Sequence, residues 1–281
     1  MTNGGTHHGQ TLSIAYVGDD VVMTLTPVTE RADGTQPEAL VVVGADNAMG
    51  HLVSVEAHRA GQPRGAPTTT YTIDFVASMP STGTALRIAR HIVARSGANA
   101  LTSGAVVGPD STLIASASGW FRQGGAGPAT GAPISTGTAS QLSTPPEAAA
   151  VILSPFGDLD PAGSPIARTL GLELTDATAE HVAMRVANVT SLLNGNGGLH
   201  GGVTGLAMTL AAEAMASTAD AVARPLHVDL QYWRPLGTDH RPVSITVDMV
   251  RRGNTTATAT ATGYTTDGRP GVQATIVLAL G

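Results

Sequence analysis

The residues best suited to chemistry form a glycine-rich stretch from Asn194 to Gly202, which reads NGNGGLHGG and runs straight into an apolar segment of helix length. Glycines at the start of a helix let a ligand approach the backbone, where the first N–H groups lack partners inside the helix. Such N–H groups, aided by the helix dipole, can hold a carbonyl oxygen while it becomes an oxyanion. A tight turn with a His cap needs the same residues, so spacing alone leaves both interpretations open. The stretch lacks the third glycine of a dinucleotide fingerprint.

Asp46 is the second candidate, because it interrupts the apolar run from Leu40 to Met49. A carboxylate in such a segment is rarely buried without a partner, since its desolvation is costly. Partial burial would raise its pKa above the reference value of about 3.9 and make it a better general base near neutral pH. The alternative is an exposed Asp on a stripe of small residues. Glu213 is a rival acid that we expect to be solvated or to face a domain boundary.

The elements that must position these residues occur in the same order in both halves of the chain. Each half has a strand pair, one apolar segment of helix length and four strands with period-2 alternation and matching turns. Pro80 and Pro235 lie 155 positions apart, and Gly97 and Gly253 lie 156 apart, which indicates an internal duplication. The expected helices are 38–58 and 201–217. The expected strands are 72–77, 84–95, 98–107 and 112–120, then 227–233, 242–252, 255–264 and 271–280, with strand pairs within 11–27 and 172–188.

This repeat predicts an N-terminal unit at 1–121, a linker at 122–163 and a C-terminal unit at 164–281. The linker is rich in Gly, Pro, Ser, Thr and Ala, so it cannot bury enough apolar surface to fold alone. Each unit is expected to wrap a curved antiparallel sheet around one buried helix. That arrangement, repeated, is an α+β architecture.

Composition excludes several classes of protein. The 281 residues contain no Cys, and all 15 basic residues are Arg. A chain without Lys has no P-loop and no Schiff base, and one without Cys has no disulfide, thiolate metal site or thiol nucleophile. The net charge of −6 argues against a nucleic-acid partner. No nucleophile elbow or zinc-protease motif is present, so we expect neither metal nor cofactor. No apolar run reaches the roughly 20 residues that span a bilayer, so we expect no membrane partner and a cytoplasmic location.

The glycine-rich stretch resembles the signature of the hotdog-fold acyl-CoA thioesterases, specifically the PaaI-like group. That signature is an Asn, a glycine-rich stretch, Leu-His-Gly-Gly, and an acid nine positions after the His. Asn194, Leu199, His200, Gly201 and Gly202 match it. The resemblance covers residues 166–281 and reaches the first half more weakly, through the repeat. It implies a tandem (double) hotdog fold, thioesterase activity and an acyl-CoA substrate.

One departure from the signature is informative. Thr209 stands nine positions after His200 and cannot act as a base. Superposing the two helical segments places Asp46 at that position in the first half, with Pro37, Glu38 and Ala39 where His-Gly-Gly should be. In this family the site is similar to a seam between two units, with His-Gly from one and the acid from the other. The resemblance therefore implies one hybrid site per chain and a second site that has decayed.

The resemblance also implies roles for single residues. The Gly201 N–H would polarise the thioester carbonyl, and Asn194 or the His200 backbone would orient the acyl group. Asp46 would activate water or attack directly as a nucleophile. The family places a hydroxyl near the acid, on the first strand after the helix, and counting along this chain assigns it to Thr70.

The phosphates of CoA need cations, and Arg is the cation that this chain offers. Arg95, Arg251 and Arg252 lie at turns that resemble the basic turn of the family, and with Gly202 they are the expected substrate-binding residues. Ordinary surface arginines are an equally open interpretation. Many hotdog units assemble further, which leaves a homo-oligomer of the two-unit chain open.

Two other functions stay open at this point. Asp46 and His51 have the separation of the hotdog hydratase motif D-x-N-P-x-H, which would predict a hydratase or dehydratase acting on an enoyl or 3-hydroxyacyl thioester. However, Asn47 stands one place early and the motif's Pro is missing. A non-catalytic acyl-CoA-binding protein is the second alternative, because half of each site is missing. Turnover that collapses in Asp46→Asn while acyl-CoA binding persists would favour the thioesterase.

Overall fold

The computed structural model describes residues 14–281, apart from 18–19, 63–64, 124–155, 188–189 and 219–220. The first half contains β1 (Ile14–Val17), β2 (Asp20–Thr24), η1 (Pro27–Thr29), α2 (Leu40–Arg59), β3 (Thr68–Phe75), β4 (Ala85–Ser96), β5 (Asn99–Val107) and β6 (Leu113–Arg122). The second half contains η2 (Gly157–Leu159), α3 (Pro165–Leu170), β7 (Leu172–Ala177), β8 (His181–Val186), η3 (Thr190–Leu192), α4 (Gly201–Ala216), β9 (Arg224–Tyr232), β10 (Val243–Arg252), β11 (Thr256–Tyr264) and β12 (Pro270–Ala279).

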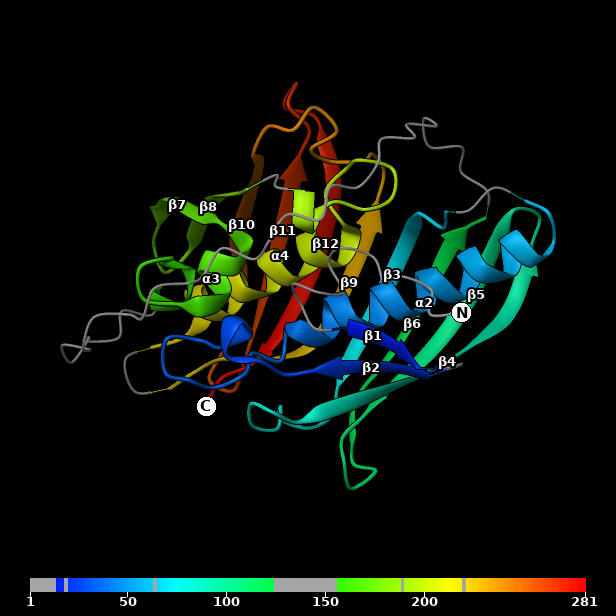
Figure 1. Ribbon diagram of the computed structural model, residues 1–281. Helices are drawn as coiled ribbons and strands as arrows, with labels where there is room; N and C mark the ends of the chain where they lie inside the picture. The colour runs from blue at the N-terminus through cyan, green and yellow to red at the C-terminus, as the bar shows by residue number, and fades with distance from the viewer. Residues whose placement is uncertain (1–13, 18–19, 63–64, 124–155, 188–189, 219–220) are drawn as a thin grey trace.

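The strands form one antiparallel sheet in the order β1-β2-β4-β5-β6-β3-β9-β12-β11-β10-β8-β7. Each half contributes its strands in the same relative order, so the internal duplication expected from the sequence is confirmed. The two helices lie across the strands on the concave side of this sheet (Figure 1). The expected α+β class, with one helix wrapped by a curved antiparallel sheet in each half, is also confirmed.

The α4 helix and the first half of α2 are buried on all sides, as their largely apolar composition predicts. Every residue of α4 from Gly202 to Ala216 is buried, and so is α2 from Leu40 to Met49. The strands around them alternate between core and surface, as β5 and β11 show. Within the described residues, no helix is both long and apolar enough to cross a membrane.

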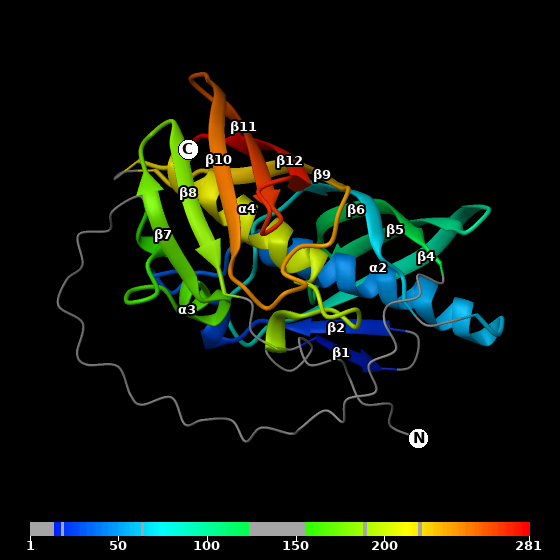
Figure 2. The ribbon, with the colours of Figure 1, turned by 90° about the horizontal axis from the view of Figure 1, so that it is seen from above.

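The two halves are joined by main-chain hydrogen bonding as well as by side-chain packing. Strand β3 pairs with β9 in an antiparallel ladder that runs from Thr70 opposite Gln231 to Asp74 opposite His227. Beneath this seam, α2 and α4 pack against each other (Figure 2). The seam makes the sheet continuous, so the position of one helix relative to the other is set by the ladder above them.

Glycines bring the two helix backbones unusually close. A Cβ on Gly202 would lie 2.7 Å from the Val43 Cα, and one on Gly205 would lie 2.7 Å from a methyl group of Val42. Moving forward along α2 therefore corresponds to moving backward along α4, so the helices run antiparallel. This contact places the start of α4 directly against the first two turns of α2.

The predicted linker at 122–163 is only partly accessible to description, since residues 124–155 lie outside the described part. Its last residues are folded: Leu159 of η2 is fully buried, and η2 packs against α4. The α3 helix begins at Pro165, and Ser164 caps its N-terminus by accepting a hydrogen bond from the Ala167 N–H. The last residues of the predicted linker thus pack against the C-terminal unit, and the boundary at residue 163 stays a prediction.

Gly202→Ala tests the close approach of the helices. The added methyl group meets the α2 backbone, which cannot turn aside as a side chain would, so we expect the free energy of unfolding to fall by about 1–3 kcal/mol. Urea unfolding measures it. Gly195→Ala is the matched control, because a Cβ there meets nothing within 4 Å. Equal stability of the two variants would contradict the tight contact.

Candidate active site

Asp46 is buried where α2 meets the start of α4, with 3% of its surface exposed. Its Oδ2 accepts a hydrogen bond from the Gly202 N–H at 2.9 Å, and its Oδ1 accepts one from the Thr68 hydroxyl at 2.7 Å. The first contact crosses between the two halves of the chain. The expected burial is confirmed, and the alternative of an exposed Asp is wrong.

His200 is the N-cap residue of α4. Its Nδ1 accepts a hydrogen bond from the Gly202 N–H at 3.1 Å and lies 3.5 Å from Asp46 Oδ2. Burial lowers the pKa of His200 to about 4, so the ring is neutral near pH 7. A neutral ring that accepts at Nδ1 carries its proton on Nε2. The Gly202 N–H is thus shared between an imidazole nitrogen and a carboxylate, and no imidazolium competes for the carboxylate.

Asn194 shapes the glycine-rich loop that leads into α4. Its side-chain oxygen accepts hydrogen bonds from the N–H groups of Asn196 at 2.9 Å and Gly198 at 3.3 Å. Gly197 takes a φ of +80°, which a residue with a Cβ rarely adopts. The structure therefore gives Asn194 a part in holding the loop, while its contact with an acyl group stays a prediction.

The hydroxyl beside the acid belongs to Thr68, and the assignment to Thr70 is wrong. A β-bulge lies between these residues, because Thr68 pairs with Phe121 whereas Thr70 pairs with the adjacent Trp120. The extra residue, Thr69, shifts the alternation of β3 by one. Thr68 consequently faces α2, and Thr70 is exposed. Counting along the sequence cannot detect a bulge, so only the register reveals the correct residue.

Two tyrosines that the sequence reasoning missed complete the surroundings. The Tyr232 hydroxyl donates to the Gly201 carbonyl at 3.0 Å, and a Cβ on Gly201 would lie 3.1 Å from its ring. Tyr71 on β3 is fully buried. Burial, and then the charge of Asp46, raise the pKa of both phenols well above 10, so both keep their protons. Their inward positions on β3 and β9 become evident only once the strand register is known.

The basic residues assigned to CoA lie elsewhere. Arg252 donates to the carbonyl of Ala216, the last residue of α4, at 2.6 Å. That carbonyl is about 21 Å along the helix axis from Gly202, at 1.5 Å per residue. Arg95 pairs with Glu56, and Arg251 is exposed. The structure does not place these arginines beside Asp46, and their binding of CoA stays a prediction.

His51, the other half of the hydratase motif, stacks on Tyr16 with 3.8 Å between ring centroids. Its Nδ1 lies 3.5 Å from Arg90 Nη1. Five residues along a helix turn a side chain by about 140°, so His51 and Asp46 project from different faces of α2. This arrangement gives the hydratase interpretation no support.

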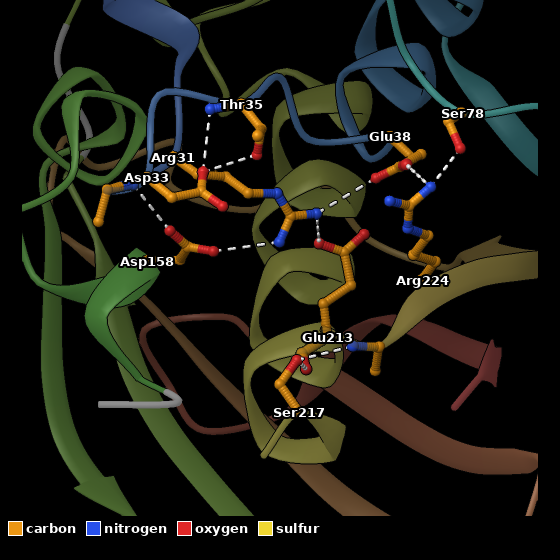
Figure 3. A network of polar contacts seen from close by, with 11 residues as sticks. Arg31, Asp33, Thr35, Glu38, Ser78, Asp158, Glu213, Ser217 and Arg224 are labelled. Carbon is orange, nitrogen blue, oxygen red and sulfur yellow. Dashed lines mark hydrogen bonds and ion pairs between the residues drawn. The ribbon is translucent and has the colours of Figure 1, made fainter. Parts of the chain in front are cut away.

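The counterpart position, related to the Asp46 site by the repeat, holds a buried ion cluster (Figure 3). Arg31 lies 2.6 Å from Glu213, 3.3 Å from Glu38 and 3.1 Å from Asp158. Glu213 is fully buried, so the expectation that it is solvated is wrong, although it does lie where the two halves meet. Thr209 donates its hydroxyl to the Gly205 carbonyl at 2.8 Å. No sequence motif indicated this cluster.

Comparison with known proteins finds similarity at two levels, in sequence for part of the chain and in fold for all of it. Residues 192–279 match the family model described as the acyl-CoA thioesterase N-terminal domain, a stretch that includes the glycine-rich loop, α4 and β9–β12. No curated protein sequence matches the chain significantly.

Solved structures match the whole chain. A tesB protein of Mycobacterium avium subspecies paratuberculosis superposes with a TM-score of 0.64 at 9% identity, covering 98% of each chain. The acyl-CoA thioesterase II TesB2 of Mycobacterium marinum gives 0.58 at 9%, covering 98% of this chain and 96% of that one. A hot dog fold protein of Alicyclobacillus acidocaldarius gives 0.62 at 8%, covering 99% of each. At these identities the likeness establishes the fold. That fold is the double hotdog fold, and the match to the acyl-CoA thioesterase domain covers residues 192–279.

Proposed function

We propose that the chain hydrolyses the thioester of a fatty or aryl acyl-CoA at a single composite site, where Asp46 from the first unit meets the start of α4 from the second. The observation that carries this proposal is the hydrogen bond between the Gly202 N–H and Asp46 Oδ2, at 2.9 Å. It puts the acid and a helix N-terminus side by side, which acyl transfer to water requires.

The chemistry follows from these groups. Asp46 takes a proton from a water molecule, whose oxygen adds to the thioester carbonyl carbon while the C=O π electrons move to the oxygen. The N–H at Gly201 and the dipole of α4 stabilise that oxyanion. When the C–O double bond re-forms, the C–S bond breaks and the CoA thiolate leaves. A thiol with a pKa of about 8.5 leaves without a strong general acid, which suits a site whose His200 is neutral.

Three features of the counterpart position support one site per chain. Ala39, the N-cap residue of α2, makes no side-chain cap hydrogen bond, whereas His200 caps α4. Thr209 stands where the acid would be. Arg31 and its acidic partners fill the space between the start of α2 and the late turns of α4. We infer that this position has become structural.

Asp46→Asn is expected to lower kcat for acyl-CoA hydrolysis by about 10²–10⁴, because the general base is lost. The amide oxygen can still accept from the Gly202 N–H, and the amide NH2 can donate to the Thr68 hydroxyl, so acyl-CoA binding should persist in calorimetry. Release of CoA can be followed with a thiol reagent, since the chain has no Cys of its own.

Asp74→Asn is the matched control, because Asp74 is an exposed carboxylate on β3 that pairs with His227 at 2.8 Å. Full activity of Asp46→Asn would contradict the assigned base. A wild-type chain that binds acyl-CoA of every chain length but releases no thiol would favour the non-catalytic binding protein.

Thr68→Val and Thr70→Val separate the two candidate hydroxyls. Loss of a hydrogen bond to a charged group costs about 1.5–3 kcal/mol, so we expect Thr68→Val to lower kcat about tenfold or more. Thr70→Val, on the exposed face of the same strand, should turn over like the wild type. Steady-state kinetics on one acyl-CoA decide between the two hydroxyls. A larger loss of kcat in Thr70→Val than in Thr68→Val would contradict the assignment to Thr68.

Glu213→Gln tests the ion cluster at the counterpart position. Burial, opposed by Arg31, raises the pKa of Glu213 from 4.5 to about 8. Between those values the unfolded chain has released a proton that the native state keeps, so wild-type stability falls as pH rises, by at most about 1.4 kcal/mol per pH unit. Urea unfolding from pH 5 to 8 should show this slope reduced in Glu213→Gln. The exposed Glu173→Gln is the control, and an unchanged slope in Glu213→Gln would count against the assignment.

A further inference from the structure

One hydroxyl beside the composite site has no acceptor for its proton. Tyr71 is fully buried, and its phenolic O–H donates to no group within the described residues. A buried hydroxyl without an acceptor destabilises a fold, so its retention calls for an explanation. Its neighbours Thr68 and Tyr232, in contrast, both donate to protein acceptors.

The position of Tyr71 points to the chemistry. Tyr71 lies on the buried face of β3, the face from which Thr68 reaches Asp46. Asp46 and Tyr232 are the two side chains whose electrostatics act on its hydroxyl, and the Asp46 backbone N–H lies nearby as well. Because Tyr232 bonds to Gly201 and Asp46 bonds to Gly202, the Tyr71 hydroxyl lies in the group of side chains around the start of α4.

We propose that the Tyr71 hydroxyl donates a hydrogen bond to the carbonyl oxygen of the bound thioester, as the side-chain partner of the backbone donor at Gly201. The inference rests on the proposed function and adds a second hydrogen-bond donor to its oxyanion hole. When water adds to the carbonyl carbon and its π electrons move to oxygen, the O–H of Tyr71 shortens its hydrogen bond to that oxygen. The proton stays on Tyr71, and the electron pair returns as the C–S bond breaks.

The surroundings suit a donor that never ionises. Burial and the negative charge of Asp46 hold the pKa of Tyr71 well above 10, so the hydroxyl keeps its proton across the working range of the enzyme. In the absence of substrate it has no protein acceptor, so binding a carbonyl oxygen requires no existing hydrogen bond to break. An already oriented donor in a dry site is what stabilises a developing oxyanion most strongly.

Tyr71→Phe tests the proposal, because it removes the hydroxyl and keeps the ring that packs against Gly119. We expect kcat for acyl-CoA hydrolysis to fall 10²- to 10³-fold, as when one oxyanion donor is removed elsewhere, with KM changed less than threefold. The loss should be the same from pH 6 to 9. The urea midpoint should stay equal or rise, because the lost hydroxyl donates to no protein acceptor within the described residues.

Tyr264→Phe is the matched control: its hydroxyl is 3.4 Å from Thr246 on β10, away from the site, and wild-type kinetics are expected. A Tyr71→Phe enzyme within threefold of wild-type kcat, alongside an inactive Asp46→Asn, overturns the role of Tyr71 alone. A kcat loss that comes with a lowered urea midpoint also overturns it, because the residue would then be structural. A wild-type chain that releases no thiol from any acyl-CoA overturns the proposed function and this inference together.

Discussion

The hydrogen bond from the Gly202 N–H to Asp46 Oδ2 is the contact on which the arrangement of the site depends. It exists only because two helix backbones come within van der Waals contact, and that requires a glycine where a Cβ would lie 2.7 Å from the neighbouring Cα. The same N–H also lies at a helix N-terminus, where it has no partner within its own helix. A single peptide therefore combines close packing, electrostatic stabilisation of a buried carboxylate and the orientation of that carboxylate toward the start of α4.

The two positions related by the repeat stabilise buried charge in different ways. At the composite site one carboxylate is held by neutral donors, namely a backbone N–H and a hydroxyl. At the counterpart position three acidic side chains surround Arg31. Removing one member of such a cluster leaves an uncompensated buried charge, so it is retained as a unit once formed. Its members come from three segments of the chain, and it ties η2 and the loop before α2 to the core.

Much of this architecture could be predicted from the sequence because the patterns are local. The apolar segments around Asp46 and after His200 and most of the period-2 strands appear where the spacing indicated, whereas β3 begins at Thr68 instead of residue 72 and β9 at Arg224 instead of residue 227. The cap at His200 and the burial of Asp46 follow from chemistry that a few adjacent residues determine. These features need no knowledge of which strand lies beside which.

The missed features all depend on contacts between distant residues. The bulge that presents Thr68 in place of Thr70 is a property of the β3–β6 pairing. The partner that buries Glu213 is Arg31, 182 positions earlier in the chain. Tyr71 carries no motif, and its significance comes from the strand register that turns it toward Asp46. Side-chain alternation can be read from one strand, whereas a register requires two.

The continuous ladder between β3 and β9 makes the arrangement of the two halves independent of protein concentration. In a dimer of single units, a site with acid and oxyanion donor on different subunits would dissociate as the concentration falls. Here both halves belong to one chain and share a hydrogen-bonded seam, so each meets the other at an effective concentration that dilution leaves unchanged. The geometry of the site is thus a property of each molecule, whatever its abundance.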